Sequence, residues 1–267
     1  MITYPFAYQR AANLAEAEAL LGANPEAKLL AGGQTLIPTM KQRLANPPLL
    51  IDISGLHELS GIRRDGERLV LGAALTHAEV SGSPEVRTLI PALAELASHI
   101  GDPAVRHLGT LGGSVANNDP AADYPAAVLG LNASVITTRR ELPADEFFTG
   151  MFETMLAPDE ILRAVAFPVP KRAAYAKFAN PASRYAMVGV FVAQTAEGVR
   201  VAVTGAAPSV RRLPRMEKAL EASFTPEAVA HIKIDADGLN EDLHGSAQYR
   251  AHLVTVMAKR AVAAALA

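Results

Sequence analysis

The residue types of two short segments indicate where this chain binds a ligand. Residues 31–35 read Ala-Gly-Gly-Gln-Thr, and residues 109–114 read Gly-Thr-Leu-Gly-Gly-Ser. Glycine tolerates positive φ angles and has no Cβ, so consecutive backbone N–H groups can converge on one anion. Thr35 and Ser114 each add a hydroxyl that can donate to a phosphate oxygen. Together the two loops predict a site for a pyrophosphate group.

A single glycine pair would be explained equally well by a tight turn between a strand and a helix. Two such loops in one chain, each beside a hydroxyl, favour ligand binding instead. The two usual nucleotide fingerprints, G-x-G-x-x-G and G-x-x-x-x-G-K-[ST], are absent from the sequence. The pattern therefore argues against a Rossmann fold and against a P-loop protein.

Two carboxylates follow the second loop. Asp119 stands directly before Pro120, and Asp123 follows four residues later. A carboxylate in this region can accept hydrogen bonds from both hydroxyls of a ribose if the loop wraps a nucleotide. An Asp-Pro turn is the favoured interpretation of Asp119. We expect Asp123 to be the ribose ligand.

Composition limits the classes of protein to be considered. Half of the residues are apolar and the formal net charge is −2, which is typical of a globular protein without a polyanionic partner such as a nucleic acid. The lack of cysteine excludes disulfides, thiolate nucleophiles and cysteine-bound zinc or iron–sulfur clusters within this sequence. The seven histidines are scattered, so we expect no metal site. No apolar run is long enough to span a membrane and no leader is evident, so we expect a cytoplasmic protein.

The elements that must position the two loops alternate between strands and helices as far as residue 167. We expect strands at 27–30, 49–53, 68–74 and 161–167, and helices at 13–21, 36–44 and 91–100. Beyond the prolines at 168 and 170 we expect a β-hairpin and then a helical cluster, with strands at 187–195 and 199–204 and helices at 213–222, 226–232 and 247–266. The expected domains are residues 1–170, with subdomains of about 1–55 and 56–170, and residues 171–267.

Two further motifs accompany the glycine loops, Ile-Gly-Asp-Pro-Ala-Val-Arg at 100–106 and Asp-Pro-Ala-Ala-Asp at 119–123. With these motifs the chain resembles the FAD-binding medium subunits of molybdenum hydroxylases. That family includes the flavoprotein chain of aerobic carbon monoxide dehydrogenase and the flavin domain of xanthine dehydrogenase. Segments at 145–150, 175–178 and 246–250 also fit, so the resemblance extends over essentially the whole chain.

The resemblance implies an α+β fold. FAD would lie between a two-part N-terminal α/β domain and a C-terminal lobe made of a three-stranded antiparallel sheet and a helical bundle. Residues 31–35 and 110–114 would hold the pyrophosphate, with the positive charge of Lys28 nearby. Asp123 would bind the ribose of the adenosine half.

The same resemblance assigns residues to the flavin. Ile161 or Leu162 would pack against the cofactor, Lys177 would approach the flavin ring, and Tyr185 would cover one face of the isoalloxazine. A solvated charge explains Lys28 or Lys177 equally well, and ordinary core packing explains Tyr185. The cofactor-binding residues that we expect are Lys28, Leu30, Ala31, Gly32, Gly33, Gln34, Thr35, Leu36, Ile100, Thr110, Leu111, Gly112, Gly113, Ser114, Asn117, Asp119, Ala122, Asp123, Ile161, Leu162, Lys177 and Tyr185.

The resemblance also implies partner chains. Hydroxylation would take place at a molybdenum cofactor on a large subunit, and the [2Fe–2S] clusters of a small subunit would carry the electrons, in a dimer of heterotrimers. The FAD of this chain would pass those electrons to an external acceptor such as a quinone, oxygen or NAD. No catalytic residue is expected in this chain itself.

Two other functions remain open from the sequence. One is a self-contained FAD-dependent oxidase or reductase of the same superfamily, which needs a proton donor over the flavin. The other is a scaffold subunit that has lost its flavin, against which the two intact loops argue. If the loops bind FAD, Gly33→Val and Gly112→Val should each abolish binding and leave the fold largely intact.

Overall fold

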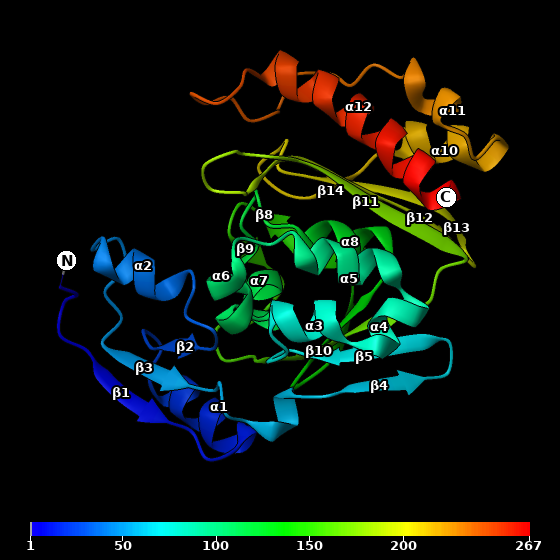
Figure 1. Cartoon of the computed structure of the whole chain (residues 1–267). Coiled ribbons are helices and arrows are strands. Elements are labelled where there is room, and N and C mark those ends of the chain that lie inside the picture. Colours follow the sequence, from blue (N-terminus) through cyan, green and yellow to red (C-terminus); the bar gives the residue numbers. More distant parts are fainter. Residues whose placement is uncertain (1) are drawn as a thin grey trace.

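The first lobe of the molecule is a small parallel sheet with two helices (Figure 1). In the computed structural model, which describes residues 2–267, the strand order is β1-β3-β2 and both pairs are parallel. The buried face of α1 packs against β3 in one apolar cluster. The elements are β1 (Ala7–Arg10), α1 (Leu14–Ala23), β2 (Lys28–Leu30), α2 (Leu36–Lys41) and β3 (Leu49–Asp52).

The start of α1 agrees with its sequence signal. The Asn13 side chain accepts a hydrogen bond from the Glu16 N–H at 2.9 Å and so caps the helix. The Glu16 carboxylate accepts from the N–H of Ala12 at 2.7 Å, one residue before the position that a capping box requires. The helix was expected to end at residue 21, and it continues through Gly22 to Ala23.

A second lobe is built on a five-stranded antiparallel sheet of order β4-β5-β10-β6-β7. Short helices pack around this sheet and bury a large apolar core with β5 and β10. Its strands are β4 (Ile62–Asp65), β5 (Arg68–Gly72), β6 (Ser134–Thr137), β7 (Glu141–Pro143) and β10 (Leu162–Pro168), with a separate pair β8 (Phe148–Gly150) and β9 (Glu153–Thr154). Its helices are η1 (His57–Leu59), α3 (His77–Gly82), α4 (Pro84–Leu89), α5 (Pro91–Ser98), α6 (Pro103–Leu108), α7 (Leu111–Asn117), α8 (Tyr124–Gly130) and α9 (Ala144–Phe147).

The third lobe is an antiparallel sheet of order β11-β12-β13-β14 with three helices. The expected hairpin is confirmed, because β12 and β13 pair from Gly189 opposite Thr204 to Thr195 opposite Gly198. Where three strands were expected, the sheet gains a fourth strand of two residues at its edge. The elements are β11 (Arg172–Ala179), β12 (Ala186–Thr195), β13 (Gly198–Thr204), β14 (Arg211–Arg212), α10 (Pro214–Ala222), α11 (Pro226–Ala230) and α12 (Ala247–Leu266).

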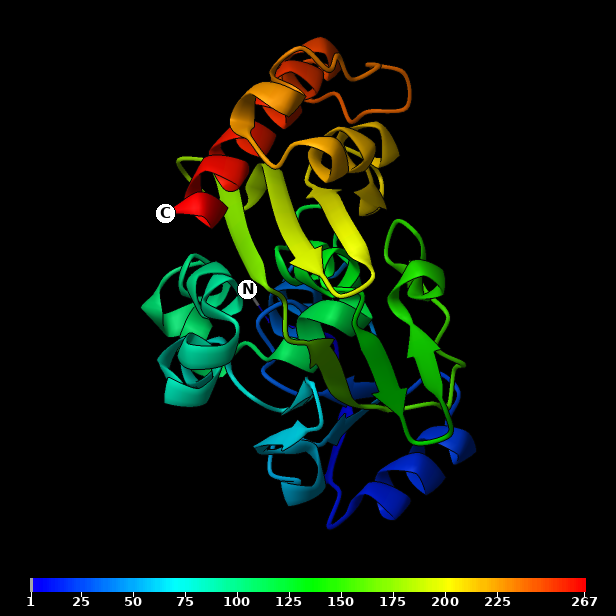
Figure 2. The same cartoon turned by 90° about the vertical axis from the view of Figure 1, so that its right-hand side faces the viewer.

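Both faces of this third sheet are covered (Figure 2). Alternate residues of β12, such as Val190 and Val192, pack with the C-terminal helices, whereas Phe191 and Ala193 belong to the core of the second lobe. This arrangement explains why β12 reads as a nearly continuous apolar run rather than an alternating one. The second and third lobes therefore share a core across the prolines at 168 and 170.

The stretch between β5 and β6 contains more helices than the sequence predicted. Helices α4, α6 and α7 have six or seven residues each, which is too short for a clear hydrophobic period. None of the helices within residues 2–267 is long and apolar enough to cross a membrane.

Candidate functional site

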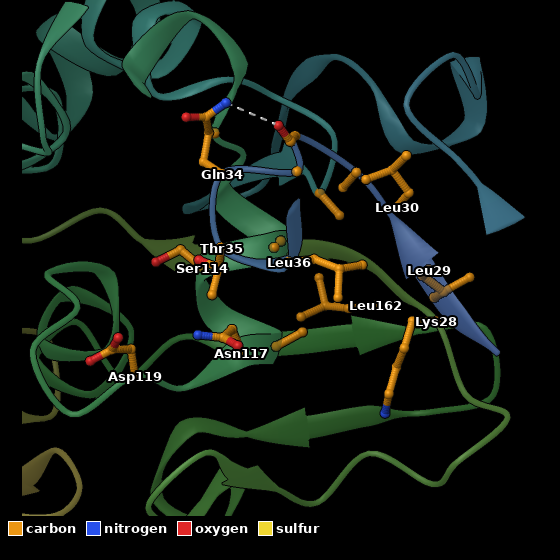
Figure 3. Close-up of a pocket in the computed structure, with 18 of the residues that line it drawn as sticks. Lys28, Leu29, Leu30, Gln34, Thr35, Leu36, Ser114, Asn117, Asp119 and Leu162 are labelled. Atoms are coloured by element: carbon orange, nitrogen blue, oxygen red, sulfur yellow. Dashed lines mark hydrogen bonds between the residues drawn. The ribbon is translucent and has the colours of Figure 1, made fainter. Parts of the chain in front are cut away.

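A cavity of about 750 Å³ opens between the first and second lobes. Its volume falls within the range of cofactor and small-molecule sites, about 300–1,000 Å³. Residues from β2, the first glycine loop and α7 surround it, together with the segment that leads into β10 (Figure 3). The two loops that the sequence singled out thus face the same space.

The first glycine loop supplies backbone donors to this cavity. It leaves the end of β2 at Leu30 and enters α2 at Leu36, and Gly33 adopts a φ of +67°. The N–H groups of residues 32–35 donate to no other group within residues 2–267. Four consecutive donors beside the positive end of a helix match the needs of an anion. This observation supports the predicted role of the loop.

The second segment is a helix rather than a loop. Thr110 is the N-cap of α7, and Gly112, Gly113 and Ser114 lie in its first turn. The N–H groups of the turn are already used, with donation from Leu111 to Leu75 O, from Gly112 to Ala73 O, from Gly113 to Thr110 Oγ1 and from Ser114 to Thr110 O. The expectation that backbone donors of both segments converge on one anion is therefore wrong for the second segment.

The two glycines of α7 have different surroundings. A Cβ added at Gly112 would lie 2.5 Å from the Cβ of Ala73 and 2.8 Å from its carbonyl oxygen, so this glycine allows α7 to pack against the chain after β5. A Cβ at Gly113 would meet only Thr110 Oγ1, at 2.8 Å, and Gly113 lines the cavity. Gly112 therefore serves packing, and Gly113 leaves room for a ligand to approach the helix.

Gly32 brings the two segments into contact. A Cβ at this position would lie 1.9 Å from the carbonyl oxygen of Leu108 and 2.8 Å from the Cα of Gly109. No side chain can be accommodated at that distance, so only glycine lets the first loop touch the chain that enters α7. The contact fixes the width of the cavity where the two lobes meet.

Most of the residues expected to bind the cofactor surround this cavity. Within residues 2–267, Thr110, Leu111 and Lys177 do not line it. Those that do are Lys28, Leu30, Ala31, Gly32, Gly33, Gln34, Thr35, Leu36, Ile100, Gly112, Gly113, Ser114, Asn117, Asp119, Ala122, Asp123, Ile161, Leu162 and Tyr185.

Asp119 and the neighbouring asparagines show how this wall is held. The Asp119 carboxylate accepts a hydrogen bond from the Ala121 N–H at 2.8 Å, so the favoured Asp-Pro turn is confirmed although the residue also lines the cavity. Asn118 adopts a φ of +43°, and its side-chain amide donates to Gly150 O and Glu153 O at 2.8 Å each. These contacts fasten the β8–β9 pair to the end of α7.

Asp123 is paired rather than free. Its Oδ2 accepts from Lys177 Nζ at 2.9 Å and its Oδ1 accepts from the Tyr175 hydroxyl at 2.5 Å. Burial raises the pKa of Asp123, and the charge of Lys177 and the hydrogen bonds from Lys177 and Tyr175 oppose that rise. Residues 54 positions apart in the chain therefore form a buried cluster at the cavity wall.

His77 is a cavity residue that the sequence did not single out. Its imidazole is 4% exposed, and Nδ1 has no hydrogen-bond partner within the described chain. Burial, and to a lesser extent the charge of Arg106, lowers its pKa to about 4, so the ring is neutral at pH 7. Nε2 lies beside Gly109, where a Cβ would approach it to 2.6 Å. No local pattern distinguishes this histidine from the other six.

Glu160 holds the wall that leads to Ile161. Its carboxylate accepts from Arg140 Nη2 at 2.9 Å, from Thr137 Oγ1 at 2.6 Å and from the Ala157 N–H at 3.0 Å. The Arg140 hydrogen bonds are the main cause that lowers the pKa of Glu160 from 4.5 to about 2. The Glu160 side chain is 1% exposed, whereas that of Arg140 is 43% exposed, so solvent screens the interaction from one side.

This lowered pKa predicts a pH-dependent contribution to stability. Because solvent screens the exposed Arg140, the ionised Glu160 should stabilise the folded chain by about 1–2 kcal/mol above pH 4.5, and this contribution should disappear as the pH falls towards 2. Chemical denaturation of wild type and Glu160→Gln between pH 2.5 and 7 measures it. The two free energies of unfolding should converge at acid pH, and a constant difference would contradict the assignment.

The features of this cavity fit a dinucleotide. The first loop with its unpaired N–H groups, Gly113 of α7 and the apolar residues Ile161 and Leu162 line one space. Such a set offers donors to a diphosphate and apolar surface to an aromatic ring. The backbone donors come from the first glycine segment alone, and the second segment contributes a helix surface without side chains.

Known proteins resemble this chain over its whole length. Residues 4–170 match the family described as the FAD binding domain in molybdopterin dehydrogenase. The carbon monoxide dehydrogenase medium chain of Hydrogenophaga pseudoflava is 38% identical and aligns over 100% of this chain and 99% of its own. The nicotine 6-hydroxylase medium subunit of Paenarthrobacter nicotinovorans is 36% identical, and the alignment covers 96% of this chain and 95% of that subunit.

Solved structures give the same result for the fold. Carbon monoxide dehydrogenase from Hydrogenophaga pseudoflava, in a form lacking the Mo-pyranopterin moiety, matches with a TM-score of 0.92 and 37% identity over 100% of this chain and 99% of the other. The expected α+β fold is thereby confirmed. The chain belongs to the FAD-binding medium subunits of the heteromeric molybdenum hydroxylases.

Proposed function

We propose that this chain holds FAD in the cavity and passes electrons from the [2Fe–2S] clusters of a small partner subunit to an external acceptor. A large partner subunit with the molybdenum cofactor would hydroxylate the organic substrate. The observation that supports this most directly is that residues 32–35 line the cavity and that their N–H groups have no acceptor within residues 2–267, in a chain of the medium-subunit family. FAD supplies a centre that accepts and releases electrons singly.

The residues of the chain would divide the binding between them. The N–H groups of residues 32–35 would donate to the diphosphate, and the Ser114 hydroxyl would add a donor from α7. Gly113 would let the diphosphate approach the helix closely, because its Cα carries no side chain towards the cavity. Lys28, an exposed residue at the start of β2, would add positive charge at the edge of the cavity.

The flavin would occupy the part of the cavity near Tyr185. That side chain is 46% exposed and lines the cavity, which is consistent with a ring that covers a bound flavin. Asp123 lies close enough to Tyr185 to help raise the pKa of its phenol, after burial and Asp119. Lys177, which pairs with Asp123, would lie behind this part of the cavity wall. The ribose role of Asp123 stays a prediction.

Other aspects of the function are also proposals. They are assembly into a dimer of heterotrimers, which the resemblance implies, and the cytoplasmic location expected from the sequence. The division into a FAD-binding domain of residues 1–170 and a C-terminal domain of residues 171–267 stays a prediction, since the second and third lobes share one apolar core.

The test is a comparison of the chain alone with the chain co-expressed with candidate partners from its genomic neighbourhood. We expect the purified chain to bind FAD with one-to-one stoichiometry, measured by flavin absorbance after desalting. The flavin should be bleached anaerobically by an organic substrate only when the small and large subunits are present, because the substrate site lies on the large one.

Two results would overturn the proposal in different ways. Bleaching of the flavin by a substrate with the chain alone would establish a self-contained oxidase or reductase. Failure to bind FAD both alone and in the co-expressed complex would leave a scaffold subunit. Each result is read from the same absorbance spectrum.

A further inference from the structure

The cluster of Asp123, Tyr175 and Lys177 joins the second lobe to the third. Asp123 precedes α8, but within the described chain its carboxylate makes no capping hydrogen bond to that helix. Both of its oxygens are directed instead to β11, where Tyr175 and Lys177 lie two residues apart and therefore on one face of the strand. The side chains of Asp123 and Lys177 are 5% and 4% exposed.

The neighbouring strand makes room for the Tyr175 hydroxyl. Gly189 of β12 pairs directly with Lys177, and a Cβ at Gly189 would lie 2.1 Å from the Tyr175 oxygen. Any other residue at this position would displace the hydroxyl from Asp123. The Tyr175 ring is packed against Phe191 at a centroid distance of 6.2 Å, so the phenol has little freedom to move.

The cluster reaches the cavity through two residues. Asp123 itself lines the cavity. Lys177 Nζ also donates to the backbone oxygen of His99 at 3.2 Å, directly before Ile100, which is another lining residue. A change in the position of the Asp123 carboxylate should therefore move the Lys177 ammonium, and with it the backbone at His99 beside the cavity wall.

We infer that Tyr175 is a positioning residue of the cofactor site, whose hydroxyl fixes the Asp123 carboxylate and, through it, the Lys177 ammonium against the FAD cavity. The inference rests on the proposed function, because it assumes that FAD occupies this cavity. Tyr175 does not line the cavity within residues 2–267 and acts only through Asp123.

The titratable groups around Asp123 determine how the Tyr175 hydroxyl affects the pKa of its carboxylate. Lys177 and Tyr175 approach from β11, His99 from the end of α5 and Tyr185 from the segment before β12, while Tyr124 is the next residue in the chain. The hydrogen bond from Tyr175 favours the ionised carboxylate and lowers the pKa of Asp123. Loss of the hydroxyl should raise that pKa, so the ion pair with Lys177 should be lost at a higher pH.

The experiment compares two tyrosine-to-phenylalanine variants of the full chain. Tyr175→Phe removes the hydroxyl that holds Asp123. Tyr124→Phe is the matched control, because the Tyr124 hydroxyl is buried beside Asp123 and has no partner among residues 2–267. The dissociation constant of FAD is measured by fluorescence quenching between pH 4.5 and 8.5, and the midpoint potential of the bound flavin is measured for each protein.

For Tyr175→Phe we expect FAD affinity at pH 7 to fall about tenfold, the effect of one hydrogen bond to a charged group. The acid limb of the affinity profile is the range in which FAD binding weakens as the pH falls. It should shift to higher pH by about one unit, and the midpoint potential of the bound flavin should change. Tyr124→Phe should match wild type in all three readouts. A purely structural role of Tyr175 would lower the melting temperature without moving the acid limb.

Gly189→Ala provides a second variant that keeps the hydroxyl but displaces it. It should shift the acid limb in the same direction as Tyr175→Phe. The inference is overturned if Tyr175→Phe has the same pH profile and potential as Tyr124→Phe while wild type binds FAD. If wild type fails to bind FAD, alone and with its partners, the proposed function fails and the inference fails with it.

Discussion

Substitution of Gly113 by valine is expected to weaken FAD binding at least about a hundredfold while the chain without cofactor remains folded. Gly113 lines the cavity, and the added side chain would fill the space next to α7 that a bound diphosphate needs. Its Cβ would press on the capping hydroxyl of Thr110, at a cost of about 1 kcal/mol that the better helix propensity of valine partly offsets.

Gly112→Val is the contrasting variant in the same helix. Its Cβ would lie 2.8 Å from the Ala73 backbone oxygen, so α7 would have to move away from the chain after β5. We therefore correct the expectation that this variant leaves the fold intact, because it should melt well below Gly113→Val. Isothermal titration with FAD and thermal denaturation distinguish the two effects. Normal FAD affinity in Gly113→Val would rule out close approach of the cofactor to α7.

Replacement of Lys177 by methionine should lower the free energy of unfolding by about 3–5 kcal/mol. The variant keeps most of the side-chain volume but leaves the Asp123 carboxylate buried without its cation. For a chain of this size the melting temperature should fall by roughly 10 °C. Thermal denaturation without cofactor, followed by circular dichroism at pH 7, measures the effect separately from FAD binding.

Two further variants test whether the loss of stability comes from the buried ion pair. Lys171→Met removes an exposed lysine just before β11 and should melt within about 2 °C of wild type, as surface substitutions usually do. The double variant Asp123→Asn/Lys177→Met removes both charges and should recover more than half of the lost stability, since no unpaired buried charge remains. If Lys177→Met melts like Lys171→Met, the pair does not stabilise the fold.

The parts of the fold that could be predicted have strong local signals. The hairpin of β12 and β13 is marked by two apolar runs around a short polar turn, and α12 by Ser246 at its N-cap and a long helical stretch. Helix α7 could not be predicted, because paired glycines disfavour a helix and its stability depends on distant contacts such as the packing of Gly112 against Ala73. The segment around Gly112 was expected to be a loop and is a helix, while the cofactor-binding role of Gly112, which lines the cavity, stays a prediction.

In the cofactor site, too, short sequence motifs could be predicted, whereas contacts between residues far apart in the chain could not. The first glycine loop was predicted correctly as part of the cavity, because its short motif combines glycines with the start of a helix. The pairing of Asp123 with Lys177 and Tyr175 depends on contacts across more than fifty residues, which no local pattern contains. His77 was missed for a similar reason, since its burial is produced by the chain around Gly109.

The contact of Gly32 with Leu108 has a consequence for the lifetime of the protein. The first lobe is small, and it meets the second lobe where the cavity lies. A ligand that fills this space bridges both lobes, so by mass action it adds about 4 kcal/mol of stability at a thousand times its dissociation constant. The abundance of the subunit would then depend on the supply of flavin, because chains made during flavin shortage would be less stable and would be degraded faster by proteases.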